Sequence, residues 1–219
     1  MTMRRAFMAL AATSCVALAA ATAFSAVDQW KAGVNYRLLE KPQAPTVKSG
    51  QIEVTEVFWY GCSHCAALDP TLEKWNTAKA DYIEFVRVPV IWGAVHRQHA
   101  KLYYTLQALR RPELHGKVFE AIHQEGLALS SQDEVKARAL QFAFCNRFGV
   151  SEQQFDAAYD SMTVAMNVRR AETLTQELRV DNVPLVFIHG KYVTSLSEAG
   201  GETQLISLIN NLAAGEQKR

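Results

Sequence analysis

Cys62 and Cys65 enclose the dipeptide Ser63-His64 and directly follow Gly61. Two thiols at this spacing can interconvert between a dithiol and a disulfide. A strand pattern ends just before Gly61 and helical spacing begins after it, so Cys62 is expected at a helix N-terminus. Unpaired backbone N–H groups and the helix macrodipole favour an anion there, and His64 adds a positive or hydrogen-bonding partner. These effects stabilise the Cys62 thiolate and predict a redox-active pair.

Stabilising the thiolate also stabilises the reduced form of such a pair, and this makes the disulfide a stronger oxidant. A thiol pKa lowered by ~3 units corresponds to ~4 kcal/mol. For a two-electron couple this free energy is a shift on the order of 90 mV. Ser63 and His64 can therefore decide the direction in which the pair reacts.

Two other interpretations of the cysteine pair are weaker. A structural disulfide at this spacing closes a loop too short to stabilise the fold much. A zinc site needs four ligands, and the sequence has no second Cys-x-x-Cys. His96 and His99 are three residues apart, a spacing more typical of a solvated helix face. We therefore expect a redox centre that requires no metal and no cofactor.

The N-terminus predicts export. Arg4 and Arg5 precede an apolar stretch of small residues that ends in Ala21-Thr22-Ala23, so residues 1–23 are expected to be a cleaved signal peptide. A retained anchor is disfavoured because the stretch is Ala-rich and short. Lipidation of Cys15 is disfavoured because Ala12-Thr13-Ser14 directly before it lacks the usual Leu and the apolar run continues past Cys15. Export to an oxidising compartment leaves Cys62, Cys65 and one odd cysteine, Cys145, which is interpreted as a small buried hydrophobe.

Composition excludes some partners. The 219 residues are 49% hydrophobic and 21% charged, with a formal net charge of +1. Loss of Arg4 and Arg5 leaves 21 basic and 22 acidic residues, a net charge of −1. Neither value favours nucleic acid or an anionic membrane surface as a partner.

The elements around the cysteines follow an α/β order. Strands are expected at residues 34–39, 51–60 and 82–90, with a helix over residues 62–78 between the second and third. Both longer strands are largely apolar, which predicts a parallel strand–helix–strand unit with covered faces.

The middle of the chain is helical. Amphipathic helices are expected over 96–111, 113–124, 132–148, 152–160 and 162–179. Ser131 with Glu134, and Ser151 with Gln154, have capping-box spacing. A hairpin (183–189 and 191–194) and a last helix (202–213) complete the chain. We therefore interpret residues 95–162 as a helical domain inserted into a domain formed by 24–94 and 163–219.

Glu56 is an acid on an otherwise apolar strand face that also carries Ile52, Val54 and Phe58. A carboxylate in such a stripe suggests burial, although a solvated edge position is the simpler alternative. Arg87, on the next strand, is either its charge partner or a surface residue. The aromatic residues just before Cys62 belong to the core or line an apolar groove. Five histidines are assigned no catalytic part: His96, His99, His115, His123 and His189.

Residues 58–65, Phe-Trp-Tyr-Gly-Cys-Ser-His-Cys, resemble the active-site segment of the DsbA family of periplasmic thiol:disulfide interchange proteins. Asn182-Val183-Pro184 and the hairpin after it resemble that family's cis-proline loop. The resemblance extends over nearly the whole chain after the signal segment. It implies a thioredoxin fold with an inserted α-helical domain, and a cis bond before Pro184.

The resemblance also implies roles. Cys62 and Cys65 would form the redox-active disulfide, Val183 would pair with substrate through its backbone, and Glu56 matches the family's buried acid beneath the active site. The implied activity is donation of disulfides to reduced, unfolded proteins newly exported to the periplasm. A DsbB-type quinone-linked membrane oxidase would reoxidise the pair.

One position departs from the family, because Ser63 stands where proline is commonest. His64 is retained, so we expect a protein more oxidising than glutathione. A disulfide isomerase or reductase on the same fold is an alternative, but almost no chain precedes the fold that could hold a dimerisation domain, so a monomer is expected. A binding or chaperone module with merely structural cysteines is the other alternative.

Overall fold

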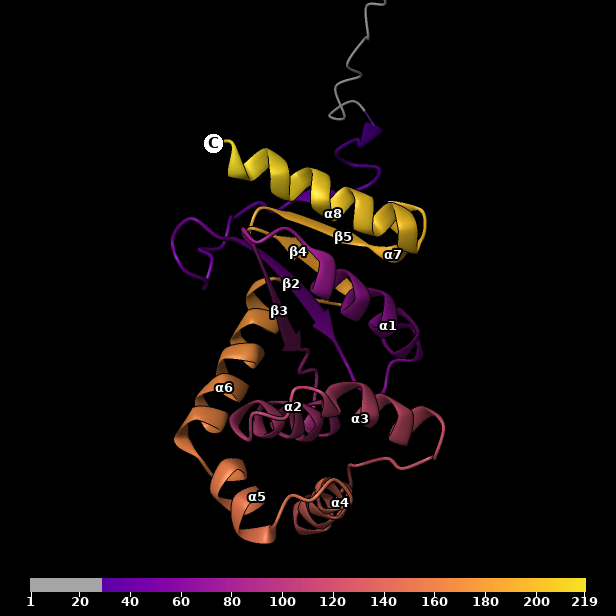
Figure 1. Ribbon diagram of the computed structural model, residues 1–219, viewed down its shortest axis with the longest axis vertical. Coiled ribbons are helices and arrows are strands. Elements are labelled where there is room, and N and C mark those ends of the chain that lie inside the picture. The colour runs from indigo at the N-terminus through magenta and orange to yellow at the C-terminus, as the bar shows by residue number, and fades with distance from the viewer. Residues whose placement is uncertain (1–28) are drawn as a thin grey trace, which may run out of the picture.

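The computed structural model describes residues 29–219 (Figure 1). The predicted signal peptide and Cys15 lie outside the described residues. Within residues 29–219, no helix is both long enough and apolar enough to cross a bilayer.

A five-stranded mixed sheet forms the centre of the upper half of the molecule in Figure 1. Its order is β1-β5-β4-β2-β3, and its strands are β1 (Arg37–Leu38), β2 (Ile52–Phe58), β3 (Ile83–Pro89), β4 (Leu185–Ile188) and β5 (Tyr192–Ser195). β2 and β3 run parallel, as the strand–helix–strand pattern predicts, whereas β4 runs antiparallel to β2. β2 lies between β4 and β3 and is buried at all seven positions, so its polar residues Glu53, Thr55 and Glu56 are buried along with its apolar ones.

Helices cover both faces of the sheet. Ile52 and Val54 of β2 pack in one core with residues of α1 (Ser63–Ala78) and α8 (Glu202–Gln217). Val57 points to the opposite face, where it packs with the end of α6 (Met162–Glu177). Because successive side chains of a strand point to opposite faces, alternate residues of β2 pack in different layers.

Four helices form a separate block below the sheet: α2 (Ala94–Ala108), α3 (Leu114–His123), α4 (Glu134–Asn146) and α5 (Glu152–Tyr159) (Figure 1). α6 runs from this block back to the sheet. Phe58 and Tyr60 lie in the core of the block and are fully buried, so the end of β2 is packed into both parts of the molecule. The predicted thioredoxin-type sheet and its helical insertion are both present.

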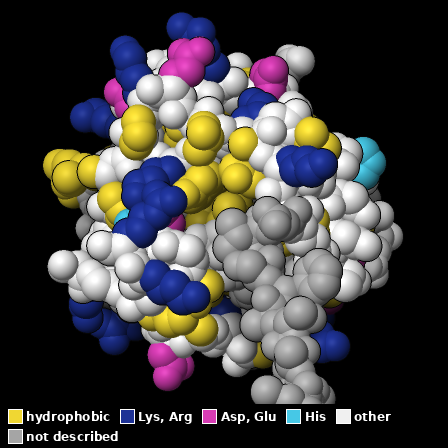
Figure 2. All heavy atoms as spheres, turned by 90° about the horizontal axis from the view of Figure 1, so that it is seen from above, with side chains coloured by type: hydrophobic (Ala, Val, Ile, Leu, Met, Phe, Trp, Pro, Cys, Tyr) yellow, Lys and Arg dark blue, Asp and Glu magenta, His cyan; other side chains and the backbone are white. Residues whose placement is uncertain are grey.

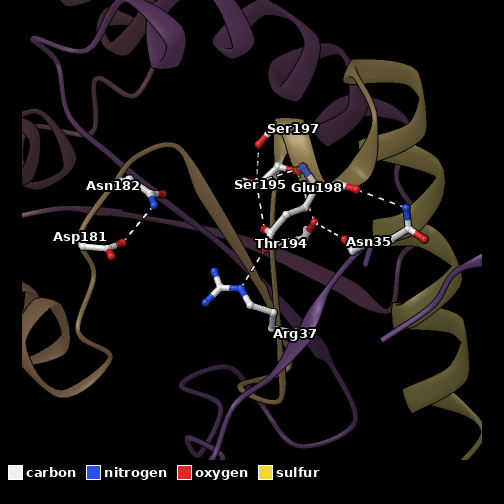
Figure 3. Close-up of polar contacts among 8 residues, drawn as sticks. All are labelled: Asn35, Arg37, Asp181, Asn182, Thr194, Ser195, Ser197 and Glu198. Carbon is white, nitrogen blue, oxygen red and sulfur yellow. Dashed lines mark hydrogen bonds and ion pairs between the residues drawn. The ribbon is translucent and has the colours of Figure 1, made fainter. Parts of the chain in front are cut away.

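Hydrogen bonds and an ion pair hold residues 35–37 against the edge of the sheet formed by β1 and β5 (Figure 3). Thr194 Oγ1 donates to the Asn35 carbonyl at 2.7 Å, and Arg37 Nε lies 2.9 Å from Glu198 of the short helix α7 (Leu196–Ala199). Val34 and Leu38 beside these contacts remain 63% exposed. On the face of the molecule seen from above, hydrophobic side chains form a central group with Lys and Arg side chains around it (Figure 2).

Several sequence-based predictions of elements and caps need correction. The strand expected at 34–39 is only two residues long, because residues 33–35 form a turn. α4 is capped by Asp133, whose carboxylate accepts from two backbone N–H groups, and not by Ser131. The last helix continues to Gln217, and α7 was not predicted. The Ser151–Gln154 capping box is confirmed.

Candidate active site

Cys62 caps the N-terminus of α1. Its backbone is extended (φ −89°, ψ 117°), and its sulfur accepts a hydrogen bond from the Cys65 backbone N–H at 3.4 Å. The Cys62 N–H donates to the Trp59 carbonyl at 3.0 Å, which closes the turn between β2 and α1. Both cysteines are free thiols, with Cys62 half-buried and Cys65 buried. The predicted helix N-terminal position of Cys62 is confirmed.

The two thiols have opposite acidities. The pKa of Cys62 is lowered to about 6, chiefly by a hydrogen bond from the Cys65 side chain and then by backbone N–H groups of residues 64 and 65 and the charge of His64. Burial raises the pKa of Cys65 far above its ordinary range, and the Cys62 thiolate adds to this effect. At neutral pH the reduced pair therefore holds one thiolate, at Cys62, and one thiol, at Cys65.

The loop before β4 faces the nucleophilic sulfur. The Val183–Pro184 peptide bond is cis, as the family resemblance implies. Cys62 Sγ lies 3.5 Å from the Val183 carbonyl oxygen, which can accept a hydrogen bond from the thiol. On the same loop, Asn182 Nδ2 donates to Asp181 Oδ1 at 3.0 Å (Figure 3). The chain thus brings together two predicted segments that lie 121 residues apart.

Ser63 and His64 are both exposed in the first turn of α1. The contribution of His64 to the lowered pKa of Cys62 comes from its backbone N–H and its charge, in that order. The Ser63 backbone N–H is not among the groups that lower this pKa. The residue that departs from the family pattern therefore lies beside the thiolate without donating to it.

Glu56 is buried, with 1% of its surface exposed, and it pairs with Arg87 at 2.9 Å. Arg87 also contacts Asp69 at 3.0 Å and Glu73 at 2.7 Å, so one guanidinium forms ion pairs with three carboxylates. Burial raises the pKa of Glu56 to about 7, and Arg87 offsets only part of this effect. The predicted burial of Glu56 is confirmed, and Arg87 is its charge partner and not a surface residue. A cleft of about 680 Å³ reaches Asp69, Glu73 and Arg87 from outside.

Histidines of the helical block hold the residues just before the active-site turn. The Tyr60 hydroxyl lies 2.8 Å from His115 Nδ1. The Tyr60 carbonyl oxygen accepts a hydrogen bond from His123 Nε2 at 2.8 Å. Trp59 is held by His96 and His99 of α2. The sequence analysis assigned these histidines no catalytic part and did not predict this structural role. Their spacing on two helices gave no sign that they converge on residues 59 and 60.

The remaining candidates lie elsewhere. Cys145 is fully buried in the core of the helical block, where burial raises its pKa to about 12. This is the environment of the small buried hydrophobe predicted for it. Among residues 29–219, no group of three His, Cys, Asp or Glu side chains is arranged to hold a metal ion.

Comparison with known proteins places the chain among bacterial redox proteins. No protein-family model matches it. The thiol:disulfide interchange protein DsbA of Pseudomonas aeruginosa is 32% identical over 191 residues, which cover 87% of each chain. DsbA of Bordetella parapertussis is 37% identical over 186 residues, or 85% of this chain and 86% of the relative. The crystal structure of P. aeruginosa DsbA superposes with a TM-score of 0.79 at 31% identity, covering 87% of this chain and 96% of that one.

Proposed function

The chain belongs to the DsbA family of thiol:disulfide interchange proteins, and on this premise we propose that it donates its Cys62–Cys65 disulfide to newly exported proteins. The observation that carries the proposal is the asymmetry of the two thiols. Cys62 is half-buried with its pKa lowered to about 6, whereas Cys65 is buried with its pKa raised. Cys62 is thus the sulfur that substrates can reach and the better leaving group.

The proposed reaction has two exchanges. A substrate thiolate attacks the Cys62 sulfur, which forms a substrate–Cys62 disulfide and breaks the Cys62–Cys65 bond. Cys65 takes the electron pair and then a proton, because its thiolate is strongly disfavoured by burial. A second substrate thiolate attacks the substrate sulfur of the mixed disulfide and releases Cys62 as a thiolate. The substrate is oxidised by two electrons, and the enzyme is left as a dithiol.

Other residues have supporting parts in this proposal. The Val183 carbonyl, 3.5 Å from Cys62, and the main chain beside cis-Pro184 provide the surface against which an extended substrate pairs. His64 stabilises the released thiolate, and Ser63 adds a hydroxyl beside it. Glu56 also raises the pKa of Cys65, and with its own pKa at about 7 it can exchange the proton that Cys65 takes up.

We propose that the chain works in the periplasm after removal of residues 1–23, as a monomer reoxidised by a DsbB-type quinone-linked membrane oxidase. Residues 95–162 would act as an inserted helical domain, and 24–94 with 163–219 as the thioredoxin-like domain. The net charge near zero agrees with a partner range that does not include nucleic acid. Expression with and without residues 1–23, followed by cell fractionation, tests the location.

Oxidative refolding of a reduced, unfolded substrate tests the function. The oxidised protein is expected to yield native disulfides in stoichiometric amounts. Cys62→Ser and Cys65→Ala, which have no Cys62–Cys65 disulfide to donate, are each expected to yield none. A measured potential close to that of thioredoxin would contradict the proposed direction. Activity only on a substrate with scrambled disulfides would identify an isomerase instead, and retention of the cellular phenotype by Cys62→Ser would favour a binding module.

A further inference from the structure

The Trp59 side chain is fixed by a hydrogen-bond chain that leads away from the active site. Trp59 Nε1–H donates to His99 Nδ1 at 3.0 Å, and His99 Nε2 lies 2.8 Å from the Ala128 carbonyl oxygen. An indole N–H can only donate and a carbonyl can only accept. His99 must therefore be neutral, with its proton on Nε2. It is 3% exposed, and burial lowers its pKa to about 4, so this state persists at neutral pH.

The ring of Trp59 is also held from its face. The His96 ring lies against it with a centroid separation of 4.5 Å and an interplanar angle of 33°. Trp92, 44% exposed, contacts the same His96 ring edge-on at 5.1 Å. The indole is thus held between α2 and the active-site turn, and its orientation is set by both histidines.

The fixed indole lies directly against the residue before the nucleophile. A Cβ atom at Gly61 would be 2.4 Å from Trp59 Cζ2, so only glycine fits under the ring. The main chain of Trp59 contacts both cysteines. Its carbonyl accepts the Cys62 N–H at 3.0 Å, and its own N–H lowers the pKa of Cys65. A shift of the indole would therefore displace Gly61 and the backbone that cradles the Cys62 sulfur.

We propose that His99 is a positioning residue for the redox centre: by holding the Trp59 indole over Gly61, it keeps the turn at Cys62 in the geometry that stabilises the thiolate. The helical block then contributes to the reactivity of a cysteine in the thioredoxin-like part without touching substrate. The inference rests on the proposed function only for its biological consequence, because thiolate stabilisation is measurable without a substrate.

The test is alkylation of Cys62 as a function of pH in the reduced full-length protein. His99→Phe keeps a ring but removes both hydrogen bonds. Trp59→Phe removes the indole donor together with the ring atoms that cover Gly61. Each is expected to raise the pKa of Cys62 by about one unit, which lowers the alkylation rate at pH 5 by about tenfold. His99→Gln retains one donor and one acceptor and is expected to stay within about twofold of the wild-type rate. Gly61→Ala should reproduce the effect of His99→Phe.

Phe155→Leu is the matched control. Phe155 is fully buried in α5, in the core of the helical block, and stacks on Tyr159. The substitution destabilises the helical block but leaves the Trp59–His99 contact intact, so the pKa of Cys62 should not move. An unchanged alkylation profile in both His99→Phe and Trp59→Phe would overturn the inference, as would an equal shift in Phe155→Leu. These outcomes are independent of the refolding assay. That assay tests the proposed function with the oxidised wild-type protein and does not use the His99 or Trp59 variants.

Discussion

The backbone N–H of Cys65 points at the sulfur of Cys62 from 3.4 Å, so the second cysteine of the pair stabilises the anion of the first. The Cys65 side chain donates to the same sulfur and is the largest cause of the lowered pKa of Cys62. The same burial that keeps Cys65 protonated thus makes it a reliable donor. Reduction of the disulfide creates this interaction, which favours the reduced enzyme and strengthens it as an oxidant.

Removing the Cys65 thiol should therefore make Cys62 less acidic. A hydrogen bond to a charged group contributes about 1.5–3 kcal/mol, and half-exposure of Cys62 reduces this, so Cys65→Ala is expected to raise the pKa of Cys62 by about one unit. Cys65→Ser keeps a donor and should raise it less. Thiolate absorbance at 240 nm against pH measures both. Identical titrations for the two variants would show that the side-chain donor has no effect.

Replacing Ser63 by the family's usual proline should change acidity little. Ser63 is the first residue of α1, where proline fits because its missing N–H has no partner in the helix. The N–H groups that lower the pKa of Cys62 belong to residues 64 and 65. Ser63→Pro is therefore expected to leave this pKa within about half a unit and to stabilise the protein by about 0.4–1 kcal/mol through the unfolded chain. Ser63→Ala is the control, and a shift confined to the proline variant would refute this account.

The sequence was sufficient for the features that local patterns encode. The alternation along residues 51–60, the glycine before Cys62 and the Ser151 capping box each depend on neighbours a few residues away, and the structure confirms them. One boundary that failed had two competing short-range signals. Asp133 caps α4 because it lies directly before the first turn, whereas Ser131 lies two residues too early.

The supporting partners of the site could not be predicted in this way. The place of Glu56 in an apolar stripe predicted its burial. Asp69 and His115, however, come from two different helices, and the contacts of Asp69 with Arg87 and with His115 form only in the folded molecule. The Trp59–His99 hydrogen bond joins residues 40 positions apart. Such contacts depend on how the helical block packs against the end of β2, and no local sequence pattern encodes that packing.

Cys145 should be dispensable for redox chemistry. It is completely buried among aromatic side chains, where burial raises its pKa to about 12. Cys145→Ala is expected to destabilise the protein by about 1–2 kcal/mol through the lost sulfur contacts, with no change in the Cys62–Cys65 potential. Denaturant unfolding and equilibration with glutathione measure the two quantities. A changed potential would show that this thiol is coupled to the redox pair.

Glu56 should make the stability of the reduced protein depend on pH. Its pKa is raised to about 7 in the folded state by burial, whereas the unfolded chain restores a value near 4.5. Between these values the folded protein binds one more proton than the unfolded chain, so the free energy of unfolding falls as pH rises. The loss begins near pH 4.5 and is complete above about pH 7. With a shift of about 2.5 units, its full size is about 3 kcal/mol.

Glu56→Gln removes this titration and keeps a side chain of nearly the same shape beside Arg87, which retains its contacts with Asp69 and Glu73. The free energy of unfolding of the variant, measured relative to the wild type in urea under reducing conditions, should therefore rise by up to about 3 kcal/mol between pH 4.5 and 7.5. Any constant offset from the lost ion pair does not affect this slope. Glu73→Gln removes a carboxylate from the same guanidinium at a half-exposed position but retains Glu56, so the fall in stability that Glu56 causes is expected to persist in this variant. Parallel curves for Glu56→Gln and the wild type would mean that Glu56 is already ionised at pH 4.5, and its proposed exchange of a proton with Cys65 near neutral pH would then fail.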